Sequence, residues 1–132
     1  MRERARDKGR LMDIVEHANN VIEFTNGLSY EAFVADSRVY YAVMKNVEIV
    51  GEAAFMLTPA FKTAHPETPW PVIQGMRHVL VHDYANIVAE TLYDTAVNGI
   101  PILLQQVEKY LAETNWEEWE ADEDLFDETK SE

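Results

Sequence analysis

Apolar residues recur every three or four positions along most of the chain, which is the spacing of α-helices that pack one face against their neighbours. The first such stretch predicts a helix from about Arg4 to Phe24, and the Asn26-Gly27 pair is a stop signal for it. Its inward positions are Leu11, Ile14, Val15, Ala18, Ile22 and Thr25. No stretch alternates with period two for long enough to form a strand, so we predict an all-α fold.

A second long helix is predicted after Asp36, whose side chain can cap its N-terminus. A short helical turn, Ser29 to Phe33, precedes it. The inward face of the second helix repeats in alternating steps of three and four: Tyr40, Val43, Val47, Val50, Ala54 and Leu57. This is a helix-packing seam, and Gly51 on it would let a neighbouring helix come close.

Prolines mark the rest of the predicted bundle. Thr58-Pro59 is expected to end the second helix, and a proline-rich loop is expected up to Pro71. Pro71 suits the first turn of a third helix, Pro71 to His82. A fourth helix should begin near Ile87 and kink near Pro101, which lacks an amide hydrogen. We therefore predict a bundle of four main helices over residues 1–112, followed by a separate tail over residues 113–132.

Charge is distributed unevenly over the chain, whose net charge is −13. Residues 113–132 hold ten acidic residues and one lysine, whereas residues 1–10 hold five basic and two acidic ones. Such a body does not attract nucleic acid over long range, so any nucleic-acid role needs a local cluster. Trp116 and Trp119 stand among the acids of the tail. They leave two alternatives open: disorder, or docking on a partner's basic surface or over the protein's own cleft.

The composition excludes several classes of protein. There is no cysteine, which rules out disulfides, a thiolate nucleophile and a cysteine-type zinc site, and which fits a reducing cytoplasm. The basic N-terminus lacks the apolar region of a secretory signal, and no apolar run is long enough to span a membrane.

The candidate chemistry is concentrated in eight residues near the end of the predicted third helix. This segment carries a guanidinium, two imidazoles, a carboxylate and a phenol: Arg77, His78, His82, Asp83 and Tyr84. Residue types alone leave several interpretations open. Arg77 could pair with Glu90 or Asp94 while His82 stabilises a helix end. Glu48 and Glu52, one turn apart on the second helix, form an acidic spot that could be solvated or could pair with Arg77. His78 and His82 could also form a metal pair that lacks an obvious third ligand. Arg77 and His82 lie about 140° apart around a helix, so one chain alone does not bring them together. Two copies across a two-fold axis could.

Three features of the stretch from Lys45 to Val107 resemble the HepT family of HEPN-domain proteins, the toxin partners of MntA-type nucleotidyltransferases. They are the helix phrase Val-Glu-Ile-Val-Gly-Glu-Ala-Ala (47–54), the phrase His-Pro-Glu-Thr-Pro-Trp (65–70) and the spacing Arg77, four residues, His82, one residue, Tyr84. The residue after the motif arginine is often Asn in that family and is His78 here. The acidic tail lies outside the family core.

The resemblance implies an HEPN-type bundle and a metal-independent endoribonuclease toxin of a type II/VII-like toxin–antitoxin system. It implies that Arg77 and His82 form the catalytic pair at a homodimer interface and that no cofactor is needed. It also implies that Tyr84 accepts AMP from a nucleotidyltransferase antitoxin; His78 is a further substrate-binding candidate. The chemistry agrees, because RNA brings its own 2′-hydroxyl nucleophile and an imidazole can move protons near neutral pH. The alternative is a catalytically silent helical module that binds a nucleotidyltransferase or a nucleotide, which the net charge favours.

Overall fold

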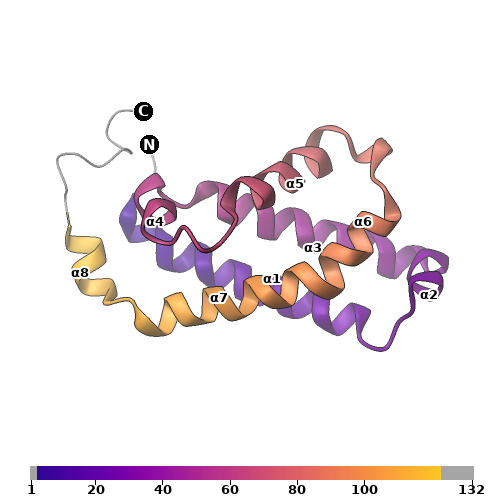
Figure 1. The fold of residues 1–132 in the computed structure, drawn as a ribbon, viewed down its shortest axis with the longest axis horizontal. Coiled ribbons are helices and arrows are strands. Elements are labelled where there is room, and N and C mark those ends of the chain that lie inside the picture. Colours follow the sequence, from indigo (N-terminus) through magenta and orange to yellow (C-terminus); the bar gives the residue numbers. More distant parts are fainter. Residues whose placement is uncertain (1–2, 123–132) are drawn as a thin grey trace.

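The computed structural model describes residues 3–122, apart from the side chain of Tyr84. The long helices α1 (Asp7–Thr25), α3 (Ser37–Met56), α5 (Trp70–His82) and α7 (Ile100–Glu113) run alternately up and down in an elongated bundle (Figure 1). Shorter helices connect or extend them: α2 (Tyr30–Ala35), α4 (Pro59–Ala64), α6 (Ala89–Asp94) and α8 (Trp116–Ala121). No strand occurs between residues 3 and 122, which confirms the all-α prediction.

The core lies between α1, α3 and α7, while α5 packs on the outer side of α3 (Figure 1). Of the predicted inward positions of α1, Leu11, Ile14 and Ala18 are fully buried, Thr25 is buried, and Val15 and Ile22 are partly buried; Val21, which was not predicted, is also fully buried. The predicted seam of α3 is buried from Val43 to Leu57 at every third or fourth residue. The apolar spacing therefore identified the packing faces correctly, because burial of these side chains is the main force that assembles the bundle.

The predicted helix starts and stops are close to the observed ones. Ser29 caps α2 by accepting the Ala32 N–H at 3.1 Å, and Asp36 caps α3 by accepting the N–H groups of Arg38 and Val39. The turn after α1 contains Gly27 at φ = 75°, a conformation that glycine adopts without strain.

The proline-rich segment contains a helix where the sequence analysis expected only a loop. Thr58 caps α4 by accepting the Phe61 N–H at 3.1 Å, and Pro59 occupies the first turn. Thr-Pro ends α3 and begins α4 at once, because proline is excluded from helix interiors but favoured at helix starts. Phe61 on α4 is fully buried.

The distortion expected near Pro101 takes the form of a π turn, Thr95–Gly99, directly before α7. There the Ile100 N–H donates to the carbonyl of Thr95, five residues earlier. Pro101 cannot donate a backbone hydrogen bond, so a helix that continues through it must widen or break on its N-terminal side. The last helix therefore runs on as α6, the π turn and α7. It begins at Ala89, two residues later than predicted, after a 3₁₀ turn at Tyr84–Asn86.

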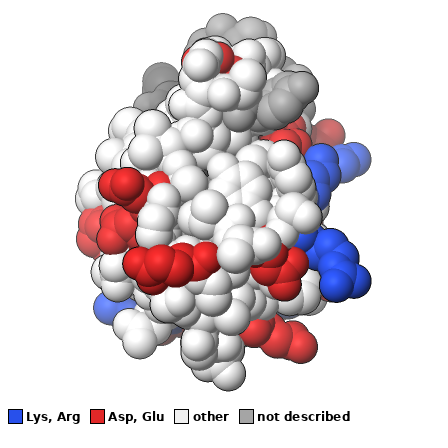
Figure 2. Space-filling model, turned by 90° about the vertical axis from the view of Figure 1, so that its right-hand side faces the viewer, with Lys and Arg blue, Asp and Glu red and all other residues white. Residues whose placement is uncertain are grey.

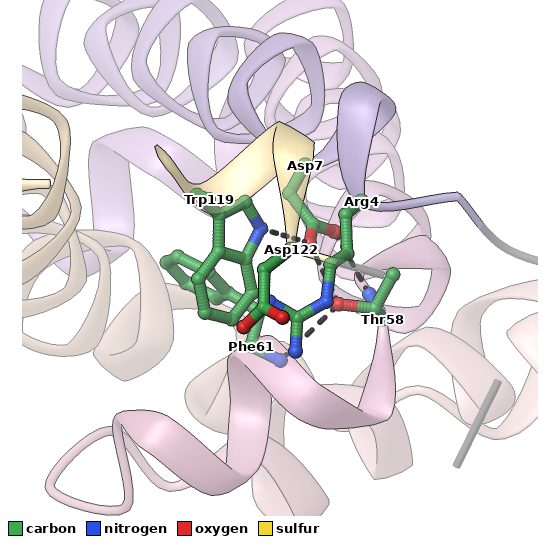
Figure 3. Close-up of polar contacts among 6 residues, drawn as sticks. All are labelled: Arg4, Asp7, Thr58, Phe61, Trp119 and Asp122. Atoms are coloured by element: carbon green, nitrogen blue, oxygen red, sulfur yellow. Dashed lines mark hydrogen bonds and ion pairs between the residues drawn. The ribbon is translucent and has the colours of Figure 1, made fainter. Parts of the chain in front are cut away.

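The helix α8 packs against the N-terminal residues and α4 of its own chain (Figure 3). We call the cluster at this contact the clasp; its residues are Arg4, Asp7, Thr58, Phe61, Trp119 and Asp122. The ring of Phe61 stacks on Trp116 with centroids 6.1 Å apart and meets Trp119 edge-on at 5.5 Å. The guanidinium of Arg4 lies 4.1 Å from the centroid of Trp119, and it donates to Asp122 at 3.3 Å.

Asp7 is the centre of the clasp and is fully buried. Its carboxylate accepts the Thr58 N–H at 2.9 Å, the Thr58 hydroxyl at 2.6 Å and the Trp119 indole N–H at 2.9 Å. Burial raises the pKa of Asp7 above its ordinary value, and these donors oppose that rise.

The position of α8 bears on the alternatives for the two tail tryptophans, which were disorder, docking on a partner and docking over the protein's own cleft. Trp116 and Trp119 dock on the N-terminal end of their own chain, at the end of the bundle opposite to the turn that follows α5 (Figure 1). They do not cover the segment that carries Arg77 and His82. Leu125, Phe126 and the acids of residues 123–132 lie outside the described residues. None of the described helices is both long enough and apolar enough to cross a membrane.

Candidate functional site

The candidate residues lie along the second half of α5 and the turn after it. Arg77 is half-buried against α3, whereas His78 and His82 are exposed. Tyr84 begins the 3₁₀ turn Tyr84–Asn86, two residues beyond the end of α5. The structure therefore brings the motif to one accessible stretch of chain, with its arginine anchored and its histidines facing solvent.

Three residues of α3 surround Arg77. The guanidinium Nε donates to the Glu52 carboxylate, and the guanidinium carbon lies 4.3 Å from the ring centroid of Phe55. A Cβ added to Gly51 would lie 2.6 Å from the Cβ of Arg77, so only glycine allows α5 this close to α3. We call Gly51, Glu52 and Phe55 the arginine cradle.

The ion pair of Arg77 decides between the sequence-based alternatives. Glu90, Asp94 and the acidic spot of Glu48 and Glu52 were possible partners, and the carboxylate that pairs with Arg77 is Glu52. The reason is tertiary: α5 packs along α3, and Glu52 lies on that helix one residue after the point of closest approach, Gly51.

The two histidines of α5 lie one turn apart and contact each other, with ring centroids 4.8 Å apart. Between residues 3 and 122, no three His, Cys, Asp or Glu side chains gather in a way that could hold a metal ion. A metal bound by His78 and His82 would therefore need ligands from elsewhere.

A second cation lies beside the arginine cradle. Lys62 Nζ on α4 donates to the Phe55 carbonyl at 3.3 Å and to the Gln74 side chain at 3.4 Å. It lies 6.0 Å from the same Phe55 ring that Arg77 covers. The sequence analysis missed Lys62 because it missed α4; the Thr-Pro helix start is the signal that could have found it. Lys62 and Arg77 therefore both lie near the ring of Phe55, and Arg77 is also paired with Glu52.

The opposite flank of α5 is apolar. A hollow of about 260 Å³ lies between α3, α5 and α7, lined by residues that include Val50, Ile73 and Met76. A second hollow of about 250 Å³ lies between α5 and the chain from Asn86 to Leu92, and Val79 lines it. Val72 lines both and is 70% exposed.

The end of the bundle that holds the turn after α5 carries both signs of charge. Figure 2 shows acidic residues on both sides of this face and across its lower middle, with basic residues mainly on the right. Among the described residues, the basic side chains do not form a broad field on this face, so attraction of a polyanion would depend on close contacts.

Known proteins resemble this chain over most of its length. Residues 14–110 match the family model described as Ribonuclease HepT-like. A protein named "Putative RNase MJ1380" from Methanocaldococcus jannaschii is 36% identical over 101 residues, which cover 76% of this chain and 93% of that protein. "Probable ribonuclease HepT" from Thermococcus cleftensis is 36% identical over 102 residues, which cover 77% of this chain and 93% of that protein. No solved structure matches the chain with significance. The match contains the arginine cradle and the whole Arg77–His82–Tyr84 motif, and on this evidence the chain belongs to the Ribonuclease HepT-like family.

Proposed function

We propose that this protein is a metal-independent endoribonuclease, the toxin of a cytoplasmic toxin–antitoxin system, with Arg77 and His82 as its catalytic pair. The observation that carries the proposal is the intact spacing of Arg77, His82 and Tyr84 inside the family match. The structure supports it by presenting His82 to solvent and holding Arg77 nearby on the same helix.

The proposed reaction needs only groups that RNA and the protein supply. One imidazole removes the proton of the 2′-hydroxyl, and the 2′ oxygen attacks the adjacent phosphorus. The bond from phosphorus to the 5′ oxygen breaks, and a second imidazole protonates that oxygen. Arg77 neutralises the charge that gathers on the phosphate oxygens in the transition state. The products are a 2′,3′-cyclic phosphate and a 5′-hydroxyl.

A homodimer completes the proposed site. Arg77 and His82 lie about 140° apart around α5, and one chain carries a single His82 for two proton transfers. Val79 lies three residues before His82 on α5, and Val72 lies ten residues, or nearly three helical turns, before it. Both valines are exposed. Pairing of two chains through this apolar flank would bring two copies of His82 toward one cleft.

Tyr84 is the proposed point of control. A nucleotidyltransferase antitoxin would transfer AMP from ATP to its hydroxyl: the tyrosyl oxygen bonds to the α-phosphorus, the bond to the β-phosphate breaks and pyrophosphate leaves. The attached AMP adds bulk and a negative charge two residues from His82 and repels RNA. Mass spectrometry of the protein expressed with its partner tests this. A mass increase of one AMP at Tyr84 is expected, and unmodified Tyr84 in an inactive complex would contradict it.

RNA cleavage by purified protein tests the nuclease itself. The wild type should cut RNA in the presence of EDTA, and Arg77→Ala and His82→Ala should not. Cleavage by His82→Ala at the wild-type rate, or a strict need for a divalent metal, would refute the mechanism.

The second candidate function is a silent binding module for a nucleotidyltransferase or a nucleotide. The net charge of −13 favours it, because a polyanionic substrate meets a repulsive body. Expression without a partner separates the two functions. Growth arrest that Arg77→Ala abolishes supports the toxin, whereas no arrest and no cleavage support the module.

A further inference from the structure

The surroundings of Arg77 assign a role to a residue outside the Arg77–His82–Tyr84 motif. Resting on the proposed nuclease function, we propose that Glu52 is a positioning residue that fixes the orientation of the Arg77 guanidinium toward a phosphate of the RNA.

The cradle restrains Arg77 at three points. Gly51 sets the position of its Cα and Cβ, because an added Cβ would lie 3.2 Å from the one and 2.6 Å from the other. The ring centroid of Phe55 lies 4.3 Å from the guanidinium carbon, so the ring blocks movement of the group on that side. Glu52 accepts from Nε and so favours one orientation of the guanidinium. An unrestrained arginine side chain has many rotamers, so three restraints on one guanidinium remove most of its freedom.

The restraint leaves the useful end of the guanidinium available. Nε is the nitrogen that Glu52 engages, and no hydrogen bond to the two terminal nitrogens is recorded from the described residues. Those nitrogens can bind two oxygens of one phosphate in parallel, which is the geometry in which arginine recognises phosphate best. The side chain of Arg77 is 20% exposed and that of Glu52 48%, so the pair lies at the surface.

A carboxylate beside a phosphate site has two opposite effects, and this makes the role measurable. The negative charge of Glu52 weakens RNA binding, whereas the fixed orientation of Arg77 favours the transition state. Loss of Glu52 should therefore lower kcat while KM stays the same or falls. A purely structural role would lower the melting temperature, and a purely repulsive role would raise kcat/KM.

The chain offers a matched control. Glu48 lies one turn before Glu52 on α3 and pairs with Lys45 at 3.1 Å. The substitution Glu48→Ala removes the same charge from the same helix without touching Arg77. The conservative variant Glu52→Gln keeps an oxygen that can accept from Nε.

The experiment measures kcat, KM and melting temperature for the wild type, Glu52→Ala, Glu52→Gln and Glu48→Ala on one fluorescent RNA oligonucleotide. We expect kcat to fall about ten-fold or more in Glu52→Ala with no rise in KM, because misoriented catalytic groups lose at least this much. Glu52→Gln should retain more activity, and Glu48→Ala should behave as the wild type. Equal kcat in Glu52→Ala and wild type, or equal losses in Glu52→Ala and Glu48→Ala, would overturn the proposal.

A second readout separates this inference from the nuclease proposal. If the wild type shows no cleavage that depends on His82, the nuclease proposal has failed, and the Nε–H signal of Arg77 in a nitrogen-15 NMR spectrum still tests the positioning. Slow hydrogen exchange in the wild type and in Glu48→Ala, lost in Glu52→Ala, supports it. Equal exchange in all three proteins refutes it.

Discussion

Two clusters in this molecule combine an arginine, an aromatic ring and a carboxylate, yet they differ in burial and in open hydrogen-bonding capacity. In the clasp, Arg4 covers Trp119, and the fully buried Asp7 accepts three hydrogen bonds. In the arginine cradle, Arg77 covers Phe55 and pairs with a Glu52 that is half exposed.

The difference in burial and in engaged hydrogen-bonding groups indicates a different role for each cluster. A buried carboxylate whose oxygens are all engaged stabilises the fold, because losing any partner leaves an unpaired polar group inside. A surface guanidinium held at one nitrogen keeps donors for a ligand. The family match covers residues 14–110. It includes the whole cradle, whereas Arg4, Asp7 and Trp119 of the clasp lie outside it.

The largest expected effect is the loss of activity at the proposed site. His82→Ala and Arg77→Ala should each lower the rate of RNA cleavage about 100-fold or more, the usual contribution of a proton-transferring or charge-stabilising group. His82 is exposed, so the melting temperature of His82→Ala should stay close to that of the wild type. Arg77→Ala also removes the contacts with Glu52 and Phe55 and should lower it slightly. Thermal unfolding and cleavage rates measured on the same preparations check this. A large loss of stability in either variant would contradict the distinction between a clasp that stabilises the fold and a cradle that serves activity.

Substitution of the clasp carboxylate should give the opposite pattern. Asp7→Ala leaves the Thr58 and Trp119 donors without an acceptor and should lower the free energy of unfolding by about 3 kcal/mol. Urea denaturation measures the loss. Asp13→Ala, an exposed acid on the same helix, is the control and should change stability by less than about 0.5 kcal/mol. The specific activity of the Asp7→Ala protein that remains folded should equal that of the wild type.

Gly51→Ala should affect stability and activity together. The new Cβ must displace Arg77, which costs about 1–3 kcal/mol for an overpacked contact and misplaces the guanidinium. Gly9→Ala in α1 is the control, because an added Cβ there meets no atom within 4 Å. It should leave activity unchanged and raise stability slightly, since alanine favours a helix more than glycine does. Full activity and undiminished stability in Gly51→Ala would show that the close approach of the two helices is unimportant.

The smallest expected effect is a pH dependence of the clasp end of the bundle. The ring of His65 lies 4.3 Å from that of Phe61 and 4.2 Å from that of Tyr110, and burial lowers the pKa of His65 below its ordinary value. Glu67, 3.8 Å away, opposes the shift. A histidine with a lowered pKa contributes its full stability above about pH 6.5 and loses it as the pH falls toward the folded-state value.

Unfolding of the wild type and His65→Gln between pH 7.5 and pH 5 measures this contribution. The difference in the free energy of unfolding between the two proteins should shrink as the pH falls. A constant difference over this range would show that His65 does not titrate against the fold.

Much of the architecture followed from local pattern. Helix periodicity identified the buried faces of α1 and α3, and Ser29 and Asp36 marked the starts of α2 and α3. These predictions succeeded because caps and apolar spacing act over a few residues. The helix α4 was missed because Thr58-Pro59 carries a stop and a start signal at the same place, and Lys62 was missed with it.

The motif of the proposed site was visible in the sequence, and its surroundings were visible in part: Gly51 was expected to allow a close helix approach, and Glu52 was one of several possible partners of Arg77. The spacing of Arg77, His82 and Tyr84 is a property of one short segment. The pairing of Arg77 with Glu52 depends on how α5 crosses α3, 25 positions away along the chain.

Local sequence pattern was enough to predict the helical class, the main packing faces and the group of residues that carries the proposed chemistry. Each of these depends on side chains that are close together in the chain. Three contacts became known from the helix packing alone. Glu52 is the carboxylate that pairs with Arg77, and Lys62 lies near the Phe55 ring that Arg77 also contacts. The two tail tryptophans pack against Asp7 and Phe61. These are contacts between distant segments, and their partners are selected by the geometry of helix packing and by the need to satisfy buried polar groups.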